Sequence, residues 1–467
     1  MAAMELGDAI ATTVAALEPH LARARAGEGP AVARTPVAEV AERLELERWI
    51  RDGGMDVGAL GDWLAEYLAM STRLQHPASL AHQVAVPDVP AAVADLVHGA
   101  INNPMAIYEM GAAAATIEAA VVDWMMRQAG LPPGAGGTLT HGGSLANLTA
   151  LLAARAAHAP DAWSAGAPHD LALLCTPSAH YSLERAAGIL GLGTDAIVPL
   201  PVDPLDRIDP DRMGEALEQA RAAGRRPFAL VAAACATSTG LFDDVAAAAD
   251  FAAAHELWLH VDAAHGASAL LSPDHRHHLA GIERADSIIW DAHKLLRVSG
   301  LCAAVLVRDA DALERAFRQH ASYLFYEDAD ADAPGPDVIT RTVECTKAAL
   351  GTKLFLELAA RGERGLGEDV AARFAVAREA WELLRERPGF EVPYEPETNI
   401  VCFRVPGDDA RQVAVRDALL ADGDVHLSSA EVGGRRHLRM VVTAPATTRA
   451  TLADTVQRIA QVAERQK

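Results

Sequence analysis

The sequence has few basic residues for its length, and it has no long uncharged apolar run. Lysine and arginine together number 41 against 63 aspartate and glutamate residues in a chain of 467, so the formal net charge is −22. Such a chain repels phosphate backbones and anionic membrane surfaces, which argues against nucleic acid and membranes as partners. At this length there is room for two or three lobes with a substantial apolar interior, as is typical of an enzyme.

Cysteines are also scarce. The five cysteines are odd in number and scattered, and most lie in apolar runs such as "DLALLC" and "NIVCF". This pattern predicts buried, reduced thiols and argues against a disulfide framework or a zinc site. The first twenty residues carry acidic side chains where a secretory signal needs basic ones. We therefore expect no signal peptide, no transmembrane span and a cytoplasmic protein.

The pattern of apolar residues changes along the chain and predicts three regions. Residues 1–72 have the pattern of amphipathic helices, and residues 73–345 alternate short apolar runs with Ala-rich stretches. The latter pattern is typical of buried parallel strands joined by helices. Residues 346–467 predict a small α+β lobe with a strand pair around "AEVGGRR" and a terminal helix from about Thr447. The acidic stretch 326–337 predicts an exposed mobile loop.

Two charged residues stand where apolar runs end. "SIIWDAHK" places Lys294 at the end of a predicted buried strand, where desolvation favours a neutral, nucleophilic amine. "LWLHVDAAHG" places Asp262 at the end of another, on the side of an open α/β sheet where ligands bind. A lysine alone at such a position would be an ordinary strand-end side chain. Together with the aspartate it indicates pyridoxal phosphate, which needs a Schiff-base lysine and a carboxylate for its pyridine nitrogen.

A third feature is a candidate phosphate site. In "THGGSLANLTALLAARAA", Gly143 and Ser144 open an Ala/Leu-rich helix. Free backbone N–H groups and a hydroxyl converge there at the positive end of the helix.

In the order phosphate loop, aspartate and lysine, the sequence resembles the fold-type-I pyridoxal phosphate enzymes, and specifically the group II amino-acid decarboxylases. The most specific stretch is "HRHHLAGIERADSIIWDAHK", which is similar to the segment before the lysine in glutamate and cysteine-sulfinate decarboxylases. Further matches are "HYSLERAAGILGLG", "TSTGLFDD", "HASYLF" and "LRMVVTAPATT", so the resemblance extends from about residue 75 to the end. It implies an α/β fold: a large domain with a mainly parallel sheet, a small C-terminal α+β domain and an N-terminal helical segment that clasps a dimer partner.

The resemblance also implies roles at the cofactor. Lys294 would form the Schiff base, and Asp262 would pair with the pyridine nitrogen. The other residues that would contact pyridoxal 5'-phosphate are His180, stacked on its ring, and Thr237, Ala264, His293, Gly143 and Ser144. Asp291 stands where relatives frequently have asparagine, so it adds a negative charge near the phosphate, and the sequence identifies no partner for it.

Further roles concern the substrate. Tyr323 would return a proton to the substrate carbon after carbon dioxide leaves, and Arg439 would pair with a substrate carboxylate. Gln83 and Asn102 match side-chain-pocket positions. The resemblance therefore implies α-decarboxylation of a small acidic amino acid such as glutamate, aspartate or cysteine sulfinate, without a metal. It also implies a homodimer with a shared active site, in which the loop carrying Tyr323 reaches the partner's cofactor.

Other interpretations stay open. His265 and "RVSG" depart from the family pattern, so a diamino, aliphatic, aromatic or carrier-tethered amino acid is an alternative substrate. Another pyridoxal phosphate lyase reaction and a non-catalytic scaffold are alternative functions. "HGGS" also occurs in the oxyanion loops of serine esterases, but the sequence has no G-x-S-x-G nucleophile elbow. The "HRHH" run at 275–278 lacks nearby acid or thiol ligands and predicts a solvated turn, not a metal site.

Overall fold

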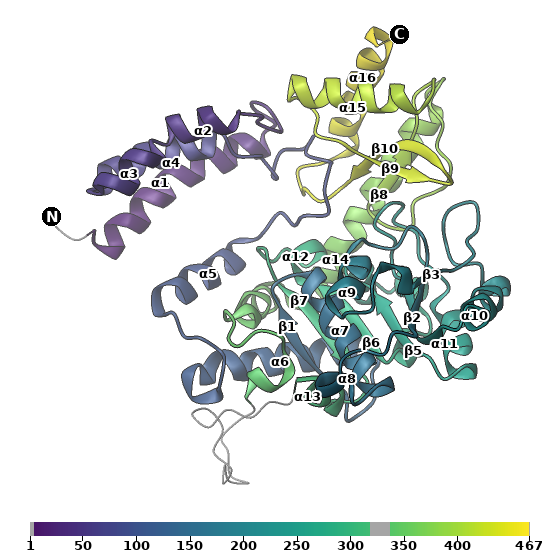
Figure 1. Cartoon of the computed structure of the whole chain (residues 1–467). Coiled ribbons are helices and arrows are strands. Elements are labelled where there is room, and N and C mark those ends of the chain that lie inside the picture. Colours follow the sequence, from purple (N-terminus) through teal and green to yellow (C-terminus); the bar gives the residue numbers. More distant parts are fainter. Residues whose placement is uncertain (1–3, 318–336, 467) are drawn as a thin grey trace. The chain divides into compact units, whose positions relative to one another are not determined.

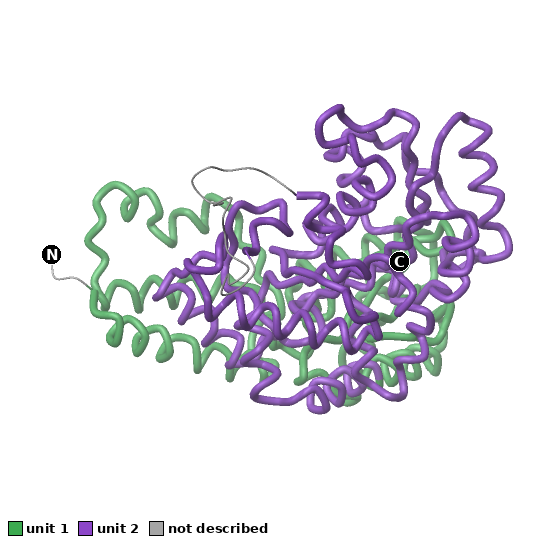
Figure 2. Tube along the Cα trace, turned by 90° about the horizontal axis from the view of Figure 1, so that it is seen from below, with its two compact units in different colours: residues 1–82, 375–467 green, residues 83–374 purple. Residues whose placement is uncertain are grey.

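A computed structural model describes residues 4–317 and 337–466, and these residues form two compact units (Figure 1). Figure 2 colours the units: unit 1 joins the chain up to residue 82 with the chain from residue 375 onward, and unit 2 is residues 83–374. Hydrogen bonds explain why the two ends of the chain share a unit. The N–H of Ala31 donates to the carbonyl of Gly423, and that of Leu80 donates to the carbonyl of His426. The three-region division with boundaries after residues 72 and 345 stays a prediction.

Unit 2 is built on a seven-stranded sheet with the order β1-β7-β6-β5-β4-β2-β3. Its strands are β1 Gly136–Thr140, β2 Leu171–Cys175, β3 Ile197–Pro199, β4 Arg226–Ala233, β5 Trp258–Asp262, β6 Ser287–Asp291 and β7 Ala303–Val307. Strands β3, β2, β4, β5 and β6 pair in parallel, whereas β7 is antiparallel to β6 and β1. Only residues 292–302 join β6 to β7, too few for a helical crossover to a parallel strand. The predicted, mainly parallel α/β sheet is confirmed.

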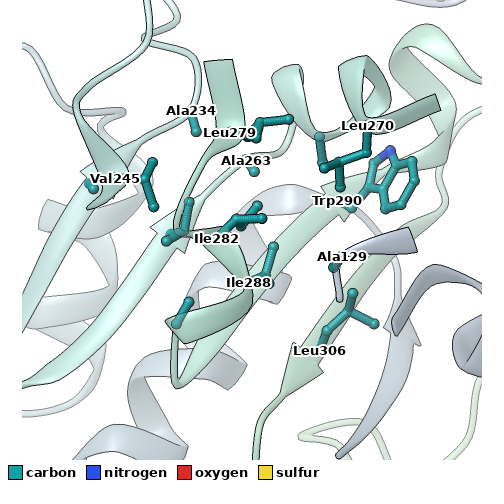
Figure 3. Close-up of a cluster of buried hydrophobic side chains, with 14 of the residues drawn as sticks. Ala129, Ala234, Val245, Ala263, Leu270, Leu279, Ile282, Ile288, Trp290 and Leu306 are labelled. Atoms are coloured by element: carbon teal, nitrogen blue, oxygen red, sulfur yellow. The ribbon is translucent and has the colours of Figure 1, made fainter. Parts of the chain in front are cut away.

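Helices cover both faces of this sheet. One face carries α7 Gly143–His158, α9 Ser182–Ile189 and α13 Asp311–Phe317, and the other carries α6 Ala112–Gln128, α10 Met213–Ala222, α11 Val245–Ala254 and residues 350–374 of α14 Leu350–Glu386. Along β6, Ile289 enters the core under α7, while Ile288 and Trp290 enter the core on the opposite face (Figure 3). Two apolar cores therefore enclose the sheet and hold the ends of its strands in place.

Unit 2 is completed by short helices. These are α5 Val89–Ile101, α8 Ala162–Ala165 and α12 Ala292–Leu295, with the 3-10 segments η1 Tyr108–Met110, η2 Thr194–Ala196, η3 Pro210–Arg212, η4 Gly266–Leu271, η5 Arg276–Leu279, η6 Ile282–Arg284 and η7 Val338–Arg341.

Unit 1 contains a small antiparallel sheet with the order β8-β10-β9. Its elements are α1 Leu6–Arg25, α2 Val37–Arg43, α3 Leu46–Asp52, α4 Val57–Ala69, the end of α14, β8 Ile400–Phe403, α15 Asp409–Asp422, β9 Ser428–Val432, β10 Arg435–Val441 and α16 Arg449–Arg465. Helix α1 packs against α4 (Figure 1). The predicted strand pair is confirmed, since β9 and β10 meet at Gly433 and Gly434, which both have positive φ angles. The terminal helix begins after Thr448, whose side chain caps it.

The cysteines differ from the prediction at one position. None of the five forms a disulfide; Cys175, Cys235, Cys302 and Cys402 are buried, but Cys345 is exposed. The correction has a simple cause, because Cys345 lies in the irregular segment before α14 and not in an apolar strand. In the part of the chain that the structure describes, no helix is long and apolar enough to cross a membrane.

Candidate active site

The side chains predicted to bind the cofactor meet at the carboxyl ends of the strands of unit 2. Strands β1, β2, β4, β5 and β6 all end at this edge of the sheet, because β7 alone runs the other way. A cavity of about 380 Å³ lies there. Its lining includes all eight predicted cofactor residues: Gly143, Ser144, His180, Thr237, Asp262, Ala264, His293 and Lys294. The edge is the one at which open α/β sheets bind their ligands.

Lys294 lies on α12, the single helical turn that follows β6. Its Nζ atom is 3.3 Å from Oδ2 of Asp291, the last residue of β6. The same oxygen is 3.7 Å from Nε2 of His293. The Asp291 side chain is only 2% exposed, while that of Lys294 is 17% exposed. The structure therefore identifies the partner of Asp291 that the sequence did not: the lysine one turn later.

Lysine is rare in this protein, which makes its placement informative. The chain has four lysines, at positions 294, 347, 353 and 467. Lys347 is buried in an ion pair with Glu118, 2.5 Å from its Oε1, and Lys353 pairs with Asp95 at 2.8 Å. Of the three described lysines, Lys294 is the one that lines the cavity.

Asp262 ends β5 and is held from two sides. Its Oδ2 accepts a hydrogen bond from Nδ2 of Asn147 at 3.0 Å, and its Oδ1 accepts one from the backbone N–H of Ala264 at 3.3 Å. Asn147 lies on α7, four residues after Gly143, so the two share one face of that helix. These bonds fix the orientation of the Asp262 carboxylate at the wall of the cavity.

The N-terminus of α7 also lines the cavity. Gly142 turns the chain from β1 into α7 with a φ angle of 100°, a conformation that favours glycine. At Gly143 an added methyl group would lie 2.7 Å from Oδ2 of Asp291, so a larger residue would displace that buried carboxylate. The backbone N–H groups of a first helical turn have no acceptors within the helix and carry partial positive charge. This end of α7 therefore suits an anion.

His180 and Thr237 reach the cavity from the turns that follow β2 and β4. Nδ1 of His180 is 2.7 Å from Oγ of Ser182, the first residue of α9. Burial lowers the pKa of His180 below its ordinary value of 6.5. The imidazole is therefore neutral at neutral pH. The ring of Tyr181 lies beside it, with 4.3 Å between the ring centroids.

Of the residues predicted to contact the substrate, Arg439, Gln83 and Asn102 lie in the part of the chain that the structure describes. Tyr323 lies outside the described residues, as does nearly all of the predicted mobile loop. Arg439 is a buried residue of β10 in unit 1. Gln83 is half-buried, and Asn102 is an exposed C-cap of α5 with a φ angle of 48°. Their roles stay predictions.

Several lining residues have no counterpart among the sequence predictions. His141 and Asn147 line the cavity, and Nδ1 of His141 is 2.5 Å from Oε1 of Glu344. Helical spacing from Gly143 is a signal that could have found Asn147. No local signal points to Glu344, because its contact with His141 spans 203 residues.

The histidine run at 275–278 is less solvated than predicted. The ring of His278 stacks on Phe242 with 4.9 Å between centroids, and that of His275 meets Phe374 edge-on at 4.8 Å. Burial is the main reason that the pKa of His278 falls to about 4. The prediction of a solvated turn holds for Arg276 and His277, which are exposed, and is wrong for the other two. Within residues 4–317 and 337–466, no group of three or more potential metal ligands occurs.

Comparison with known proteins decides the family. Residues 62–406 match the family model described as the pyridoxal-dependent decarboxylase conserved domain. The chain belongs to the pyridoxal-dependent decarboxylase family. The predicted cofactor, pyridoxal phosphate, and the predicted enzyme class, an amino-acid decarboxylase, are thereby confirmed.

Individual relatives agree with this assignment. The acidic amino acid decarboxylase GADL1 of Bos taurus is 33% identical over 372 residues, which cover 79% of this chain and 70% of the relative. L-2,4-diaminobutyrate decarboxylase of Rhizobium meliloti is 32% identical over 380 residues, which cover 80% of this chain and 75% of the relative. The crystal structure of mouse CSAD in the apo form superposes with a TM-score of 0.89 at 28% identity and covers 98% of both chains.

The residues of this pyridoxal-dependent decarboxylase fit the cofactor. Pyridoxal phosphate presents an aldehyde, a pyridine nitrogen and a phosphate group. The cavity offers the amine of Lys294, the carboxylate of Asp262 and the N-terminus of α7 in turn. Glycine at position 143 lets the Asp291 carboxylate approach this helix end, because an added methyl group there would lie 2.7 Å from Oδ2 of Asp291.

Proposed function

We propose that the protein removes the α-carboxylate of a small acidic L-amino acid, of the glutamate, aspartate or cysteine sulfinate type, and releases carbon dioxide and the amine. The observation that carries the chemistry is the meeting of Lys294, Asp262 and the start of α7 at one cavity. The names of GADL1 and mouse CSAD support an acidic substrate. The relative named L-2,4-diaminobutyrate decarboxylase makes a diamino acid the second candidate.

The proposed roles of the cavity residues follow from their placement. Lys294 would bind the cofactor covalently, and Asp262 would hold a proton on its pyridine nitrogen. Gly143 and Ser144 would bind the phosphate. His180 would stack on the ring, and the ring environment would be completed by Thr237, Ala264 and His293. When bound, pyridoxal phosphate supplies an electron sink that accepts the electron pair released by the departing carboxylate.

The chain's own residues control where protons lie. The Asp262 carboxylate is oriented by Asn147 and by the N–H of Ala264, so it can accept a hydrogen bond in a fixed direction. The nitrogen of Lys294 is the nucleophile in this proposal, and Oδ2 of Asp291 lies 3.3 Å from it. We further propose, from the family resemblance, that Tyr323 returns a proton to the α-carbon after carbon dioxide leaves.

The substrate's second carboxylate needs a cation, and we propose that Arg439 provides it, with Gln83 and Asn102 at the side-chain pocket. Arg439 is buried, and its Nη1 atom donates to the carbonyl of Ala81 and to Oγ of Ser428, both at 3.1 Å. A guanidinium held in this way keeps its planar fork in one orientation, which suits a carboxylate. The second ammonium of a diamino acid would instead be repelled.

A homodimer with a shared active site completes the proposal. Helix α5 has an apolar face whose members are 43–76% exposed: Val89, Val93, Leu96, Val97 and Ile101. Their spacing of four, three, one and four residues places them along one side of the helix. A contiguous exposed apolar surface of this kind marks an interaction site. A second copy of the chain is the proposed occupant, and the five cysteines, none of which forms a disulfide, are consistent with the proposed cytoplasmic location.

The decisive test identifies both the anchor and the product. The purified protein, loaded with pyridoxal phosphate, is incubated with a panel of acidic, diamino, aliphatic and aromatic amino acids, and amines are identified by mass spectrometry. A parallel sample is reduced with borohydride and digested, and the modified lysine is located. We expect an amine from an acidic amino acid and modification at Lys294, with Lys294→Ala inactive.

Each other outcome contradicts part of the proposal. An amine from a diamino acid alone would overturn the acidic substrate but leave the decarboxylase. Aldehyde products would indicate another reaction on the same cofactor. Modification at Lys347 or Lys353 would overturn the site itself, and no cofactor binding would favour a scaffold. Lys353→Ala is the matched control, because that lysine is described in an ion pair with Asp95.

A further inference from the structure

A line of buried hydrogen bonds leads from Asp262 into the interior of unit 2. Nδ2 of Asn147 donates to Asp262, while Oδ1 of the same amide is 2.7 Å from Nε2 of His260. Nδ1 of His260 is 2.8 Å from Oγ of Ser287, which also accepts the indole N–H of Trp258 at 2.8 Å. Asn147, His260 and Ser287 are at most 1% exposed. Water therefore does not compete for these bonds, and each must be satisfied within the protein.

The same asparagine also reaches His180. Its Nδ2 donates a second hydrogen bond to Oγ of Ser182 at 2.9 Å, and that oxygen is 2.7 Å from Nδ1 of His180. The backbone N–H of Ser182 donates to the same Nδ1 atom at 3.3 Å. Asn147 thus links two cavity residues, Asp262 and His180, that follow different strands.

The direction of every bond can be read from the Asp262 end. A carboxylate accepts hydrogen bonds, so the asparagine must turn its Nδ2 toward Asp262 and its Oδ1 toward His260. Nε2 of His260 then carries the proton that Oδ1 accepts. Burial lowers the pKa of His260 to about 4, so the ring is neutral and its Nδ1 is an acceptor. Ser287 donates to that Nδ1 and, with its lone pair, accepts from Trp258.

The branch toward His180 is also directional. Ser182 Oγ accepts from Asn147, which leaves its own hydrogen for Nδ1 of His180. Two donors, the hydroxyl and the backbone N–H of Ser182, therefore converge on Nδ1. That nitrogen cannot carry a proton at the same time, so the proton of the neutral ring lies on Nε2.

We propose that Asn147 is a positioning residue that sets the proton arrangement of both groups: it presents Asp262 as an oriented acceptor and fixes His180 as the Nε2–H tautomer. His260, held by Ser287, keeps the asparagine amide from rotating. His180 can then donate from Nε2 but cannot act as a base through Nδ1. The inference rests on the proposed function only in taking Asp262 and His180 to face the cofactor, since the hydrogen bonds belong to the chain alone.

The direct test reads the tautomer in the cofactor-free protein. Long-range ¹H–¹⁵N correlation spectra of histidine-labelled protein distinguish Nδ1–H from Nε2–H rings, and a His180→Gln variant assigns the His180 signal. We expect the Nε2–H form of His180 in the wild type and a mixture of tautomers in Asn147→Leu, which has similar volume but no amide. Ser182→Ala leaves only the 3.3 Å bond from the backbone N–H at Nδ1 of His180, so it should also admit some of the Nδ1–H form, while the bond between Asn147 and Asp262 remains.

Cofactor affinity gives a second readout. Asn147→Leu should weaken pyridoxal phosphate binding by about tenfold or more, the scale on which outer-shell hydrogen bonds act at metal sites. His260→Gln should retain both the tautomer and the affinity, because its amide can donate to Asn147, whereas His260→Leu should lose both. Trp258→Phe should change little, since Ser287 still donates to His260. Asn103→Leu, at an exposed position, is the control for the substitution itself.

The outcomes separate this inference from the proposed function. An Nδ1–H form of His180 in the wild type, or an unchanged tautomer in both Asn147→Leu and Ser182→Ala, overturns the inference even if the enzyme decarboxylates. The tautomer shift without any cofactor binding supports the inference and overturns the proposed function. If Asn147→Leu does not fold, the His260→Gln and His260→Leu pair and Ser182→Ala carry the test, with thermal unfolding as the check on folding.

Discussion

Nζ of Lys294 lies 3.3 Å from Oδ2 of Asp291, and that same carboxylate oxygen lies 2.7 Å from the position that a Cβ atom would take at Gly143, the first residue of α7. The buried carboxylate therefore has two positive neighbours, an ammonium and a helix N-terminus, which offset part of the cost of burying its charge. Asp291 at the end of β6 therefore contacts both α12 and the start of α7. Little space remains between its carboxylate and Gly143.

Gly143→Ala should weaken binding of pyridoxal phosphate. The added methyl group would lie 2.7 Å from Oδ2 of Asp291, and such overpacking typically costs about 1–3 kcal/mol. If the displaced carboxylate moves toward the phosphate site, this cost corresponds to a loss of roughly 5- to 150-fold in affinity, measured by titrating the apoprotein with cofactor. Gly188→Ala on α9, where an added methyl group has nothing within 4 Å, is the matched control. Wild-type affinity in Gly143→Ala would show that Asp291 can move freely.

The buried His260 should make the protein sensitive to acid. Its pKa falls from 6.5 to about 4 on folding, so below pH 6.5 the unfolded chain binds a proton that the folded protein does not. The folded state therefore loses no stability through His260 above pH 6.5. As pH falls from 6.5 toward 4 the free energy of unfolding decreases, by on the order of 2 kcal/mol at pH 5. Denaturant unfolding at pH 7 and pH 5 should show a smaller loss for His260→Gln than for the wild type. Equal losses would contradict the shifted pKa.

Glu357 should make the folded protein less stable as pH rises, whereas His260 makes it less stable as pH falls. This fully buried residue of α14 has its pKa raised to about 7, by burial first and then by the neighbouring carboxylate of Asp88. The folded protein keeps a proton that the unfolded chain releases above about pH 4.5, so stability falls as pH rises from there through 7. Glu357→Gln should therefore gain stability relative to the wild type between pH 5 and pH 8, by roughly 1–3 kcal/mol. Thermal unfolding of both proteins at pH 5 and pH 8 measures the difference in stability. A difference that is the same at both pH values would refute the raised pKa of Glu357.

A charged substitution in the apolar face of α5 should dissociate the proposed dimer into monomers. Leu96→Glu introduces a charge in the middle of that face, where the wild-type side chain is 45% exposed. If a second copy covers the face, burying the unpaired charge is unfavourable and the dimer should dissociate. Sedimentation analysis of wild type and variant measures this. Ile189→Glu on α9, where the side chain is 63% exposed, is the control and should leave the assembly unchanged. A variant at position 96 that sediments like the wild type would argue against this interface.

One thiol per chain should react under native conditions. Cys345 is exposed, whereas burial raises the pKa of Cys175 and of Cys302 to about 12 and also raises that of Cys402. Cys235 is buried as well. Titration with a disulfide reagent should release one equivalent from the native wild type, none from native Cys345→Ser, and five from the denatured wild type. More than one fast native equivalent would mean that a buried cysteine is accessible.

Much of the site was predictable because it follows local rules. Lys294 and Asp262 stand at the ends of apolar runs, and Gly143 and Ser144 stand where a helix begins, so the topology of a parallel sheet brings them to one edge. His260 could also have been found, because it lies two residues before Asp262 on the same face of β5. The role of His260 could not have been predicted, since it depends on a hydrogen bond to Ser287 in the neighbouring strand.

Contacts between distant segments were beyond local rules. Asn147 meets Asp262 across 115 residues and His260 across 113. The mainly parallel sheet was predicted, but the pattern of apolar runs did not show which strand is the exception; β7 is antiparallel to β6 and β1. The exposure of a side chain depends on what packs against its segment. His278 and His275 are less exposed than the sequence predicts because Phe242 and Phe374 pack against them. Cys345 is exposed although burial was predicted for the cysteines.

The sequence by itself determined the fold class, the cofactor and the residues at the ends of its strands, because apolar periodicity and chain order specify which side chains reach the edge of a parallel sheet. Only the tertiary structure decided the partner of Asp291, the link from Asn147 to both Asp262 and His180, and the proton positions along it. Those properties depend on hydrogen-bond geometry over a few ångströms between segments far apart in the chain, and no local pattern encodes such distances.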